Sequence, residues 1–311
     1  MDSRASRAPY LFPAGARLGA DNAVLQAKAN RHTVENYAGP LSIKTVISGE
    51  VAWIIGGREL VVNRSSLLVV NAGDRYSMNI DALRPVETCC VFFAPGFVEG
   101  IAMDSTSPLE RALEEPEPAA WPIPYLTALH EDSENALAKR VKSLAPRCGG
   151  GLAPSGFEED FLLVAGDLLR LYAQIREQAG RLPAVRASTR EELYRRLLIG
   201  REYLHASAGP VSLASTARAA CLSPFHFHRG FAKAFGRTPH AYLTALRLER
   251  ARIALESGAH VLEACLAAGF ESPSAFTRLF RANYASPPSA FRCKFARTGR
   301  NSEAAPSILD P

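Results

Sequence analysis

Two arginines, Arg229 and Arg278, occupy the same place in a repeated stretch of the sequence, and their side chains could bind the edge of a guanine base. Residues 223–231 and 272–280 share a Ser-Pro start, two phenylalanines four residues apart and an arginine between them, at an offset of 49 residues. The phenylalanine spacing places both rings on one helix face, so the arginine two residues from each points away from them. An outward guanidinium can donate two hydrogen bonds to guanine O6 and N7.

The repeat also predicts the elements that hold these arginines. Ser is a favoured N-cap and Pro fits the first helical turn, so each Ser-Pro pair predicts the start of a helix. The match continues as far as Tyr242 and Phe291, and just upstream its offset becomes 48 residues. A short helix, a tight turn and a second helix with an outward arginine form a helix-turn-helix unit. We therefore expect two such units joined by a helix over residues 241–257, with their second helices entering the major groove about 34 Å apart.

Positive charge is concentrated in this part of the chain. Residues 190–297 contain 16 Lys and Arg against 7 Asp and Glu, a balance of +9, whereas residues 1–189 have a balance of −3. A basic segment attached to a mildly acidic body is typical of a protein that binds nucleic acid, because phosphates attract it. Arg-rich solvated helices are also common, so charge alone does not decide between these two interpretations.

The repeated segment resembles the AraC/XylS family of transcription regulators over about 100 residues. Residues 269–281 carry the pattern Gly-Phe-x-Ser-x-Ser-x-Phe-x-Arg-x-Phe-Arg, residues 286–292 carry Ser-Pro-Pro-Ser-x-Phe-Arg, and residues 247–251 carry Arg-Leu-x-x-Ala. Two places depart from the family pattern, and in one of them Ala264-Cys265 stands where Ile-Ala is common. Glycine is usual where Ala285 stands, although Gly236 keeps it in the first unit. Alanine is disfavoured in the left-handed backbone conformation that glycine allows.

The resemblance implies which side chains contact DNA. Base edges would be contacted from both units, by Phe225, His228, Arg229, Ser274, Ala275 and Arg278. Of these, Ala275 can offer only a methyl group, which suits thymine. Phosphates would be contacted by side chains that position the protein without reading sequence, namely His226, Lys233, Arg237, Arg281 and Ser289. The simpler alternative is a solvated charge for each Lys or Arg, and a partly buried helix position for each histidine.

Other chemistries find little support in the sequence. The six cysteines form no CxxC pair and no zinc spacing, so we expect reduced, buried thiols that act as small apolar side chains. A metal-dependent cupin enzyme needs a His-x-His set with a Glu, but only His32 and His130 lie in the first 200 residues. We therefore expect no catalytic residue, no bound metal and no cofactor.

The fold class expected for the whole chain is α+β. Runs rich in Val, Ile, Phe and Trp predict strands at residues 41–47, 51–55, 59–62, 67–70 and 86–93. Helical periodicity predicts helices at residues 124–143 and 156–180, and about seven more over residues 189–296. The resemblance implies a cupin-like β-barrel, then helices that mediate dimerisation, then an all-α domain of two helix-turn-helix units.

The expected divisions follow from these elements. They are a disordered start at residues 1–20, a cupin-like sensing domain at 21–105, a helical dimerisation and linker region at 106–188, a DNA-binding domain at 189–297 and a disordered tail at 298–311. Trp53, Tyr76 and Arg75 are conspicuous in the sensing domain, but each has an ordinary structural interpretation. The sequence therefore identifies no effector-binding residue.

Residues and resemblance together favour a sequence-specific transcription regulator that responds to a small-molecule effector, with activation favoured over repression. Its expected partners are double-stranded DNA, an effector, a second copy of the chain and, for an activator, RNA polymerase. The longest apolar runs are too short to span a bilayer and no secretory signal is visible, so a cytoplasmic protein is expected. Two alternatives stay open: a metal-dependent cupin enzyme fused to a DNA-binding domain, and a non-sensing architectural DNA binder.

Overall fold

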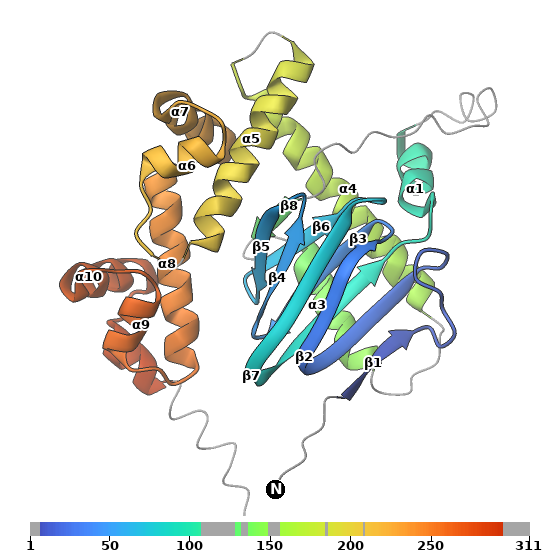
Figure 1. The fold of residues 1–311 in the computed structure, drawn as a ribbon, viewed down its shortest axis with the longest axis horizontal. Coiled ribbons are helices and arrows are strands. Elements are labelled where there is room, and N and C mark those ends of the chain that lie inside the picture. The colour runs from blue at the N-terminus through green and yellow to red at the C-terminus, as the bar shows by residue number, and fades with distance from the viewer. Residues whose placement is uncertain are drawn as a thin grey trace, which may run out of the picture. The chain divides into compact units, whose positions relative to one another are not determined.

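The chain divides into two compact units, Met1–Leu198 and Ile199–Pro311, and the boundary falls inside one helix, α5 (Ala187–Ala206) (Figure 1). The computed structural model describes residues 7–106, 128–131, 136–148, 156–183, 186–207 and 209–294. The predicted tail at residues 298–311 lies outside these residues. None of the described helices is both long enough and apolar enough to cross a membrane.

The first unit is built on an antiparallel sheet of eight strands. These are β1 (Arg7–Phe12), β2 (Ala23–Ala38), β3 (Ser42–Ser48), β4 (Glu50–Ile55), β5 (Arg58–Asn63), β6 (Ser66–Val70), β7 (Arg75–Phe92) and β8 (Ala128–Glu131). Their order is β1-β2-β7-β3-β6-β8, and β4 branches from β7 and pairs with β5. The pairings among the described residues do not close into a ring, so the cupin-like barrel remains a prediction.

Side chains from both branches of the sheet meet in one apolar core. Trp53 of β4, Leu60 of β5, Leu68 of β6 and Leu129 of β8 all lie in it and are buried. Strand β7 serves both branches, because its first half pairs with β4 and its second half with β3. The five strands predicted from Val- and Ile-rich runs match β3 to β6 and the second half of β7 to within one residue, and there the alternation of apolar residues faces this core.

Strands β1 and β2 and the first half of β7 were not predicted. Strand β1 occupies residues 7–12, within the segment for which the sequence predicts disorder. Strand β2 is 16 residues long and half of them are polar, and its pairing with β7 runs from Ala23 opposite Phe92 to Ala38 opposite Arg75. Strand β1 pairs in turn with β2. Such non-local backbone pairing leaves little trace in the local sequence.

The helices described in the first unit are α1 (Phe97–Thr106), α3 (Ala136–Cys148) and α4 (Phe157–Gly180). Helix α4 is the helix predicted at residues 156–180. The single helix predicted at residues 124–143 is wrong, because residues 128–131 form β8 and α3 begins only at Ala136. The backbone of β8 pairs with the edge strand β6, and this pairing overrides the helical pattern of the local sequence.

The second unit is helical throughout its described residues. After the end of α5 come α6 (Leu213–Ala219), α7 (Pro224–Phe235), α8 (Pro239–Glu256), α9 (Val261–Ala267), α10 (Pro273–Tyr284) and a last helical segment at residues 288–294. The pairs α6–α7 and α9–α10 are the two predicted helix-turn-helix units, and α8 is the helix that joins them (Figure 1).

Candidate nucleic-acid interface

The first helix-turn-helix unit consists of α6 and α7 with a tight turn between them. The side chain of Ser223 caps α7 by accepting a hydrogen bond from the amide of His226 at 3.3 Å, and Pro224 fills the first helical position. Within the turn, the amide of Leu222 donates to the carbonyl of Ala217 at 2.9 Å. The helix start predicted from the Ser-Pro pair is therefore present.

The second unit, α9 and α10, repeats this construction. The side chain of Ser272 caps α10 by accepting from the amide of Ala275 at 3.3 Å, and Pro273 follows it. The amide of Phe270 donates to the carbonyl of Cys265 at 3.0 Å, which is the bond equivalent to the one in the first turn. The two units share cap, turn and register, as the offset of 48 to 49 residues predicts.

Buried phenylalanines hold α7 and α10, which we call the recognition helices. Phe227 and Phe231 of α7 and Phe276 and Phe280 of α10 are completely buried. Their ring centroids are 5.4 Å apart in α7 and 5.5 Å apart in α10. Because these four rings fix the inward face of each helix, the opposite face is left to solvent or to a ligand.

The predicted base-contacting side chains lie on exposed parts of the recognition helices, with one exception. The exposed ones are Phe225, His228, Arg229, Ser274 and Arg278, whereas Ala275 is half-buried. Phe225 is 68% exposed, and a large apolar side chain in this position is available for contact with a partner. The structure thus brings three of the predicted residues together on α7 and three on α10.

The predicted phosphate-contacting side chains are all exposed, namely His226, Lys233, Arg237, Arg281 and Ser289. Two of them also contact neighbours. His226 Nδ1 lies 2.8 Å from Ser223 Oγ, so this ring supports the N-cap of α7. The guanidinium of Arg237 lies over the ring of Tyr242, with 4.9 Å between its central carbon and the ring centroid.

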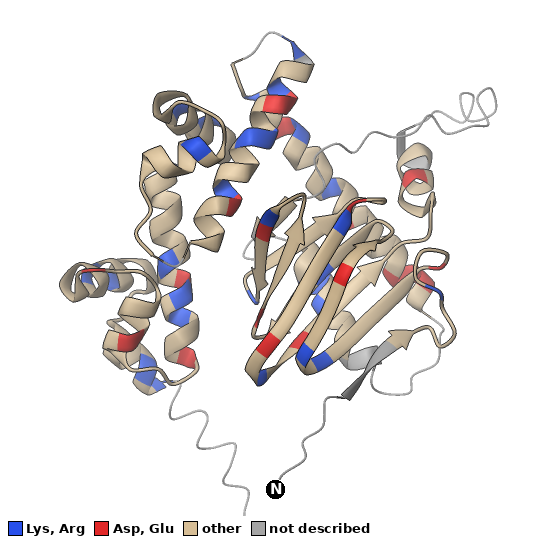
Figure 2. Cartoon of the chain, viewed as in Figure 1, with Lys and Arg blue, Asp and Glu red and all other residues tan. Residues whose placement is uncertain are grey.

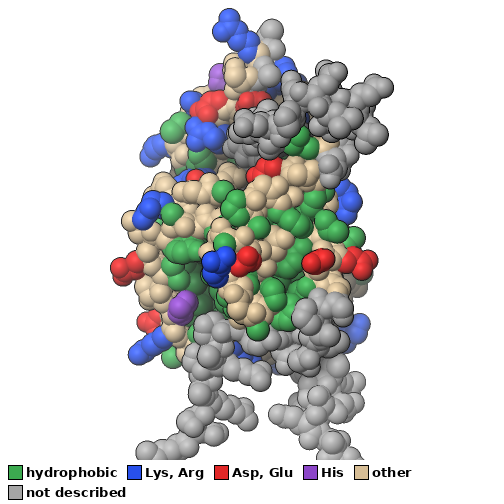
Figure 3. All heavy atoms as spheres, turned by 90° about the vertical axis from the view of Figure 1, so that its right-hand side faces the viewer, with side chains coloured by type: hydrophobic (Ala, Val, Ile, Leu, Met, Phe, Trp, Pro, Cys, Tyr) green, Lys and Arg blue, Asp and Glu red, His purple; other side chains and the backbone are tan. Residues whose placement is uncertain are grey.

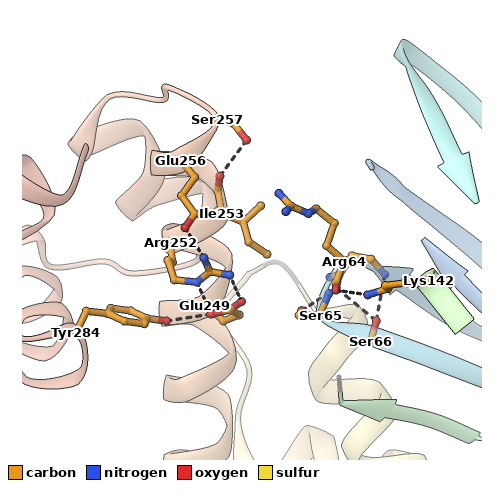
Figure 4. Close-up of polar contacts among 11 residues, drawn as sticks. Arg64, Ser65, Ser66, Lys142, Glu249, Arg252, Ile253, Glu256, Ser257 and Tyr284 are labelled. Atoms are coloured by element: carbon orange, nitrogen blue, oxygen red, sulfur yellow. Dashed lines mark hydrogen bonds and ion pairs between the residues drawn. The ribbon is translucent and has the colours of Figure 1, made fainter. Parts of the chain in front are cut away.

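Neither recognition helix carries an acidic side chain, whereas both carry arginine (Figure 2). The acidic residues of α8 are neutralised within a polar cluster that sequence reasoning missed (Figure 4). In this cluster Arg252 forms ion pairs with Glu249 and Glu256. The Glu-x-x-Arg-x-x-x-Glu spacing at residues 249–256 is the signal that could have revealed it.

The same cluster anchors the second recognition helix. At the end of α10 the hydroxyl of Tyr284 donates to Glu249 Oε2 at 3.1 Å. Burial raises the pKa of Tyr284, so its hydroxyl keeps the proton that it donates. Hydrogen bonds with Glu249 raise the pKa of Arg252. Helix α10 is therefore tied to α8 by charge-assisted hydrogen bonds as well as by apolar packing.

A second polar cluster fastens the end of α5 to α8. Arg250 donates to the carbonyl of Ser207 at 2.7 Å and also to that of His205, and Arg247 donates to the carbonyl of Gly209 at 2.9 Å. The ring of His205 is buried, and burial together with nearby arginines lowers its pKa to about 3. These contacts join residues far apart in sequence, and no local pattern indicates them.

The conspicuous residues of the first unit have structural contacts. Trp53 lies in the core, and Arg75 Nε donates to Asn36 Oδ1 at 2.8 Å. The hydroxyl of Tyr76 lies 3.2 Å from the ammonium of Lys44. Within the part of the chain that the structure describes, no three His, Cys, Asp or Glu side chains are grouped so that they could hold a metal ion.

Residues 216–294 match the family model of a helix-turn-helix domain. The chain is 42% identical over 69 residues to the regulatory protein Ada of Salmonella typhimurium, covering 22% of this chain and 20% of Ada. It is 34% identical over 84 residues to the right origin-binding protein of Escherichia coli, covering 27% of this chain and 29% of that protein. The chain therefore spans less than a third of the length of these curated relatives.

A solved structure is also similar to part of the chain. It is the crystal structure of a probable AraC family transcriptional regulator from Rhodopseudomonas palustris, at 24% identity and a TM-score of 0.31, covering 32% of this chain and 96% of that one. The family match begins inside α6 and ends with the last helical segment, so it contains both recognition helices and α8. Residues 216–294 are therefore a helix-turn-helix domain, and the two helix-turn-helix units predicted from the repeat are confirmed in this part of the chain.

Proposed function

We propose that the protein is a sequence-specific DNA-binding transcription regulator whose two recognition helices enter successive major-groove faces of one DNA molecule. One observation carries the proposal. Each recognition helix presents an arginine on the side opposite two completely buried phenylalanines, with no acidic residue on the helix. A guanidinium held outward from a rigid helix can read guanine, and a second copy held by α8 reads a second half-site.

Selection of bound sequences from a random DNA pool tests the proposal. The wild-type chain should enrich a motif with two half-elements about one helical turn apart. Arg229→Ala and Arg278→Ala should each relax one half, at a cost of about 1–3 kcal/mol in that half. Arg218→Ala is the matched control, because Arg218 is exposed on α6 outside the recognition helices. If both recognition-helix variants weaken all sequences alike, these arginines contact only phosphate.

We also propose that the first unit senses a small molecule and mediates dimerisation, as the family resemblance implies. Helix α4 buries most of its apolar side chains but exposes Leu162 and Leu163, at 50% and 40%. An exposed apolar pair on a helix favours packing against a partner. Hydrophobic side chains also gather across the middle of the face drawn in Figure 3.

Light scattering of the full chain tests the dimer. Wild type should be dimeric, and a variant with Leu162→Glu and Leu163→Glu should be monomeric, because each buried carboxylate would be left without a partner. Leu83→Glu is the control, since Leu83 is fully exposed on β7 and its replacement should leave the dimer intact. A monomeric wild type, or a dimer that survives both glutamates, contradicts this part of the proposal.

A non-sensing architectural DNA binder is the second candidate. It is favoured by the similarity to the right origin-binding protein, whose name says that it binds an origin. Such a protein would bind its selected motif with the same affinity in the presence and absence of any metabolite. A regulator would change either its DNA affinity or the transcription of a template that carries the motif, with purified RNA polymerase as the partner for an activator.

A further inference from the structure

The outward face of α7 carries a large apolar side chain. Phe225 is the second residue of this recognition helix and is 68% exposed. It precedes Arg229 by four residues, so both side chains project from the side of the helix opposite the buried rings of Phe227 and Phe231. An exposed ring therefore lies on the same face as the arginine that reads guanine in the proposed function.

Neighbouring side chains fix where this ring lies. The rings of Phe225 and His226 meet edge to face, with centroids 5.7 Å apart and an interplanar angle of 74°. His226 is itself held, because its Nδ1 lies 2.8 Å from the hydroxyl oxygen of Ser223, the N-cap of α7. A ring that is already supported at the helix start loses little further freedom when it contacts DNA, so a single apolar contact can add to affinity.

The second unit has no such side chain. Ser274 stands where the first unit has Phe225, and its hydroxyl lies 3.0 Å from that of Ser272 at the start of α10. Among the described residues of α10, Phe276 and Phe280 are buried and no large apolar side chain is exposed. Both recognition helices have 12 residues and a Ser-Pro start, so the helix-turn-helix fold does not require a ring at this position.

The major groove of DNA offers an exposed ring one kind of apolar partner. Each base pair presents hydrogen-bond donors and acceptors there, and the 5-methyl group of thymine is the apolar group among them. A phenyl ring has no hydrogen-bonding atom, so it is favoured next to a methyl group rather than next to a donor or an acceptor. Cytosine carries a hydrogen at the equivalent ring carbon, and 5-methylcytosine carries the same methyl group as thymine.

We propose that Phe225 makes the half-site bound by α7 selective for a pyrimidine 5-methyl group, which thymine provides and which methylation of a cytosine can supply in its place. Residues four apart on a helix are separated by about 6 Å along its axis, and successive base pairs by about 3.4 Å. The methyl group should therefore lie within about two base pairs of the guanine bound by Arg229. This inference rests on the proposed DNA recognition and adds that α7 distinguishes methylated from unmethylated cytosine.

Duplexes that differ by single methyl groups test this inference with the full chain. Each thymine of the motif selected from the random pool is replaced in turn by deoxyuridine, which lacks only the methyl group, and fluorescence anisotropy gives the affinity. In the half that Arg229→Ala relaxes, one such replacement should weaken wild-type binding about three- to tenfold, as expected for one lost apolar contact. At that position the wild type should also bind 5-methylcytosine more tightly than cytosine, by about the same factor.

A pair of variants assigns the effect to the ring. Phe225→Ser introduces the residue type that the second unit has at the equivalent position, and it should bind thymine and deoxyuridine equally at the sensitive position. Leu266→Ser is the matched control and should keep the wild-type response, because Leu266 is 58% exposed on α9, outside the recognition helices. Both side chains are exposed, so both variants should fold, and the wild-type comparison depends on neither.

Three results overturn the inference. They are equal wild-type affinity for thymine and deoxyuridine at every position of that half, a selected half-element made only of G·C pairs, and a methyl effect that survives in Phe225→Ser. In each of these cases the selected motif and its dependence on Arg229 remain, so the proposed DNA recognition stands. If the random pool yields no motif, the proposed function fails and this inference fails with it.

Discussion

Two backbone positions in each helix-turn-helix unit adopt the left-handed conformation, and each unit has glycine at only one of them. In the turn between the helices, Gly269 of the second unit has a φ of 85° and Cys221 of the first unit has a φ of 52°. At the end of the recognition helix, Gly236 has a φ of 70° and Ala285 has a φ of 53°. A side chain with a Cβ is strained in this region by on the order of 1 kcal/mol.

Replacement of the strained alanine should stabilise the protein. Ala285→Gly is expected to raise the free energy of unfolding by roughly 0.5–1 kcal/mol, because the strain it relieves exceeds the added entropy of glycine in the unfolded chain. Gly236→Ala should lower it by about 1 kcal/mol. No atom would lie within 4 Å of the new Cβ at residue 236, so conformation alone is measured. Urea unfolding checks both variants, and a loss of stability in Ala285→Gly would contradict the argument.

Lys44 should make the stability of the first unit depend on alkaline pH. Its pKa is about 8 in the folded chain against an ordinary value of 10.5, so between these values the unfolded chain binds more protons. Stability should therefore be reduced below pH 8 and should recover as the pH rises toward 10.5, by on the order of 2–3 kcal/mol. The free energies of unfolding of wild type and Lys44→Met at pH 7 and pH 10 check this. Groups that titrate alike in both chains contribute nothing to the difference between the two free energies. If the difference in free energy of unfolding between the two chains is the same at both pH values, the burial of a charged Lys44 is contradicted.

At the scale of elements, α5 packs against α7 at Gly200, a glycine in the interior of α5. A Cβ on Gly200 would lie 2.3 Å from Cε2 and 2.7 Å from Cζ of Phe227. Phe227 is completely buried in the core of the first helix-turn-helix unit, so its ring has no free space to enter. The absence of a side chain at residue 200 is therefore what permits the close packing of these two helices.

Gly200→Ala should destabilise the protein by about 1–3 kcal/mol through overpacking, although alanine is the better helix former. DNA selection with this variant should relax the half-site read by α7 more than the half-site read by α10. The control is Gly166→Ala in α4, where the nearest atom to the new Cβ is the flexible Arg170 Nη1 at 3.9 Å, and a neutral or stabilising effect is expected. Thermal unfolding compares the two variants, and equal stability would show that the contact with Phe227 is not tight.

The sequence best predicts the elements that are marked by nearby residues, such as a capping pair or a regular spacing of apolar side chains. Helices α7 and α10 begin at the Ser-Pro pairs and bury the phenylalanines that the spacing indicates. The segment Ala128–Glu131 contains no strand signal and becomes a strand only because β6 offers an edge. The burial of Lys44 was not predicted, since a lone lysine in a strand ordinarily faces solvent. Its burial depends on β3 being covered on both faces, and this is a property of the assembled sheet.

At the scale of the whole molecule, positive charge should govern how DNA affinity depends on salt. The chain has a net charge of +5, and the balance of +9 over residues 190–297 accounts for its sign. Lys233→Ala and Arg281→Ala should each reduce the slope of log affinity against log salt concentration by about 1 and leave the selected motif unchanged. Arg31→Ala is the control, because Arg31 lies on β2 and its side chain is 86% exposed. A slope that neither helix variant changes would show that these side chains do not contact phosphate.

The two helix-turn-helix units follow each other along one chain, so a single copy of the protein has no two-fold axis through its DNA-binding surface. Their exposed side chains also differ, since Phe225 and His226 stand where the second unit has Ser274 and Ala275. A site bound by one copy therefore has a direction and reads differently from its two ends. Inverting that site within a promoter would leave the affinity of the isolated fragment unchanged but would turn the bound protein around with respect to the start of transcription.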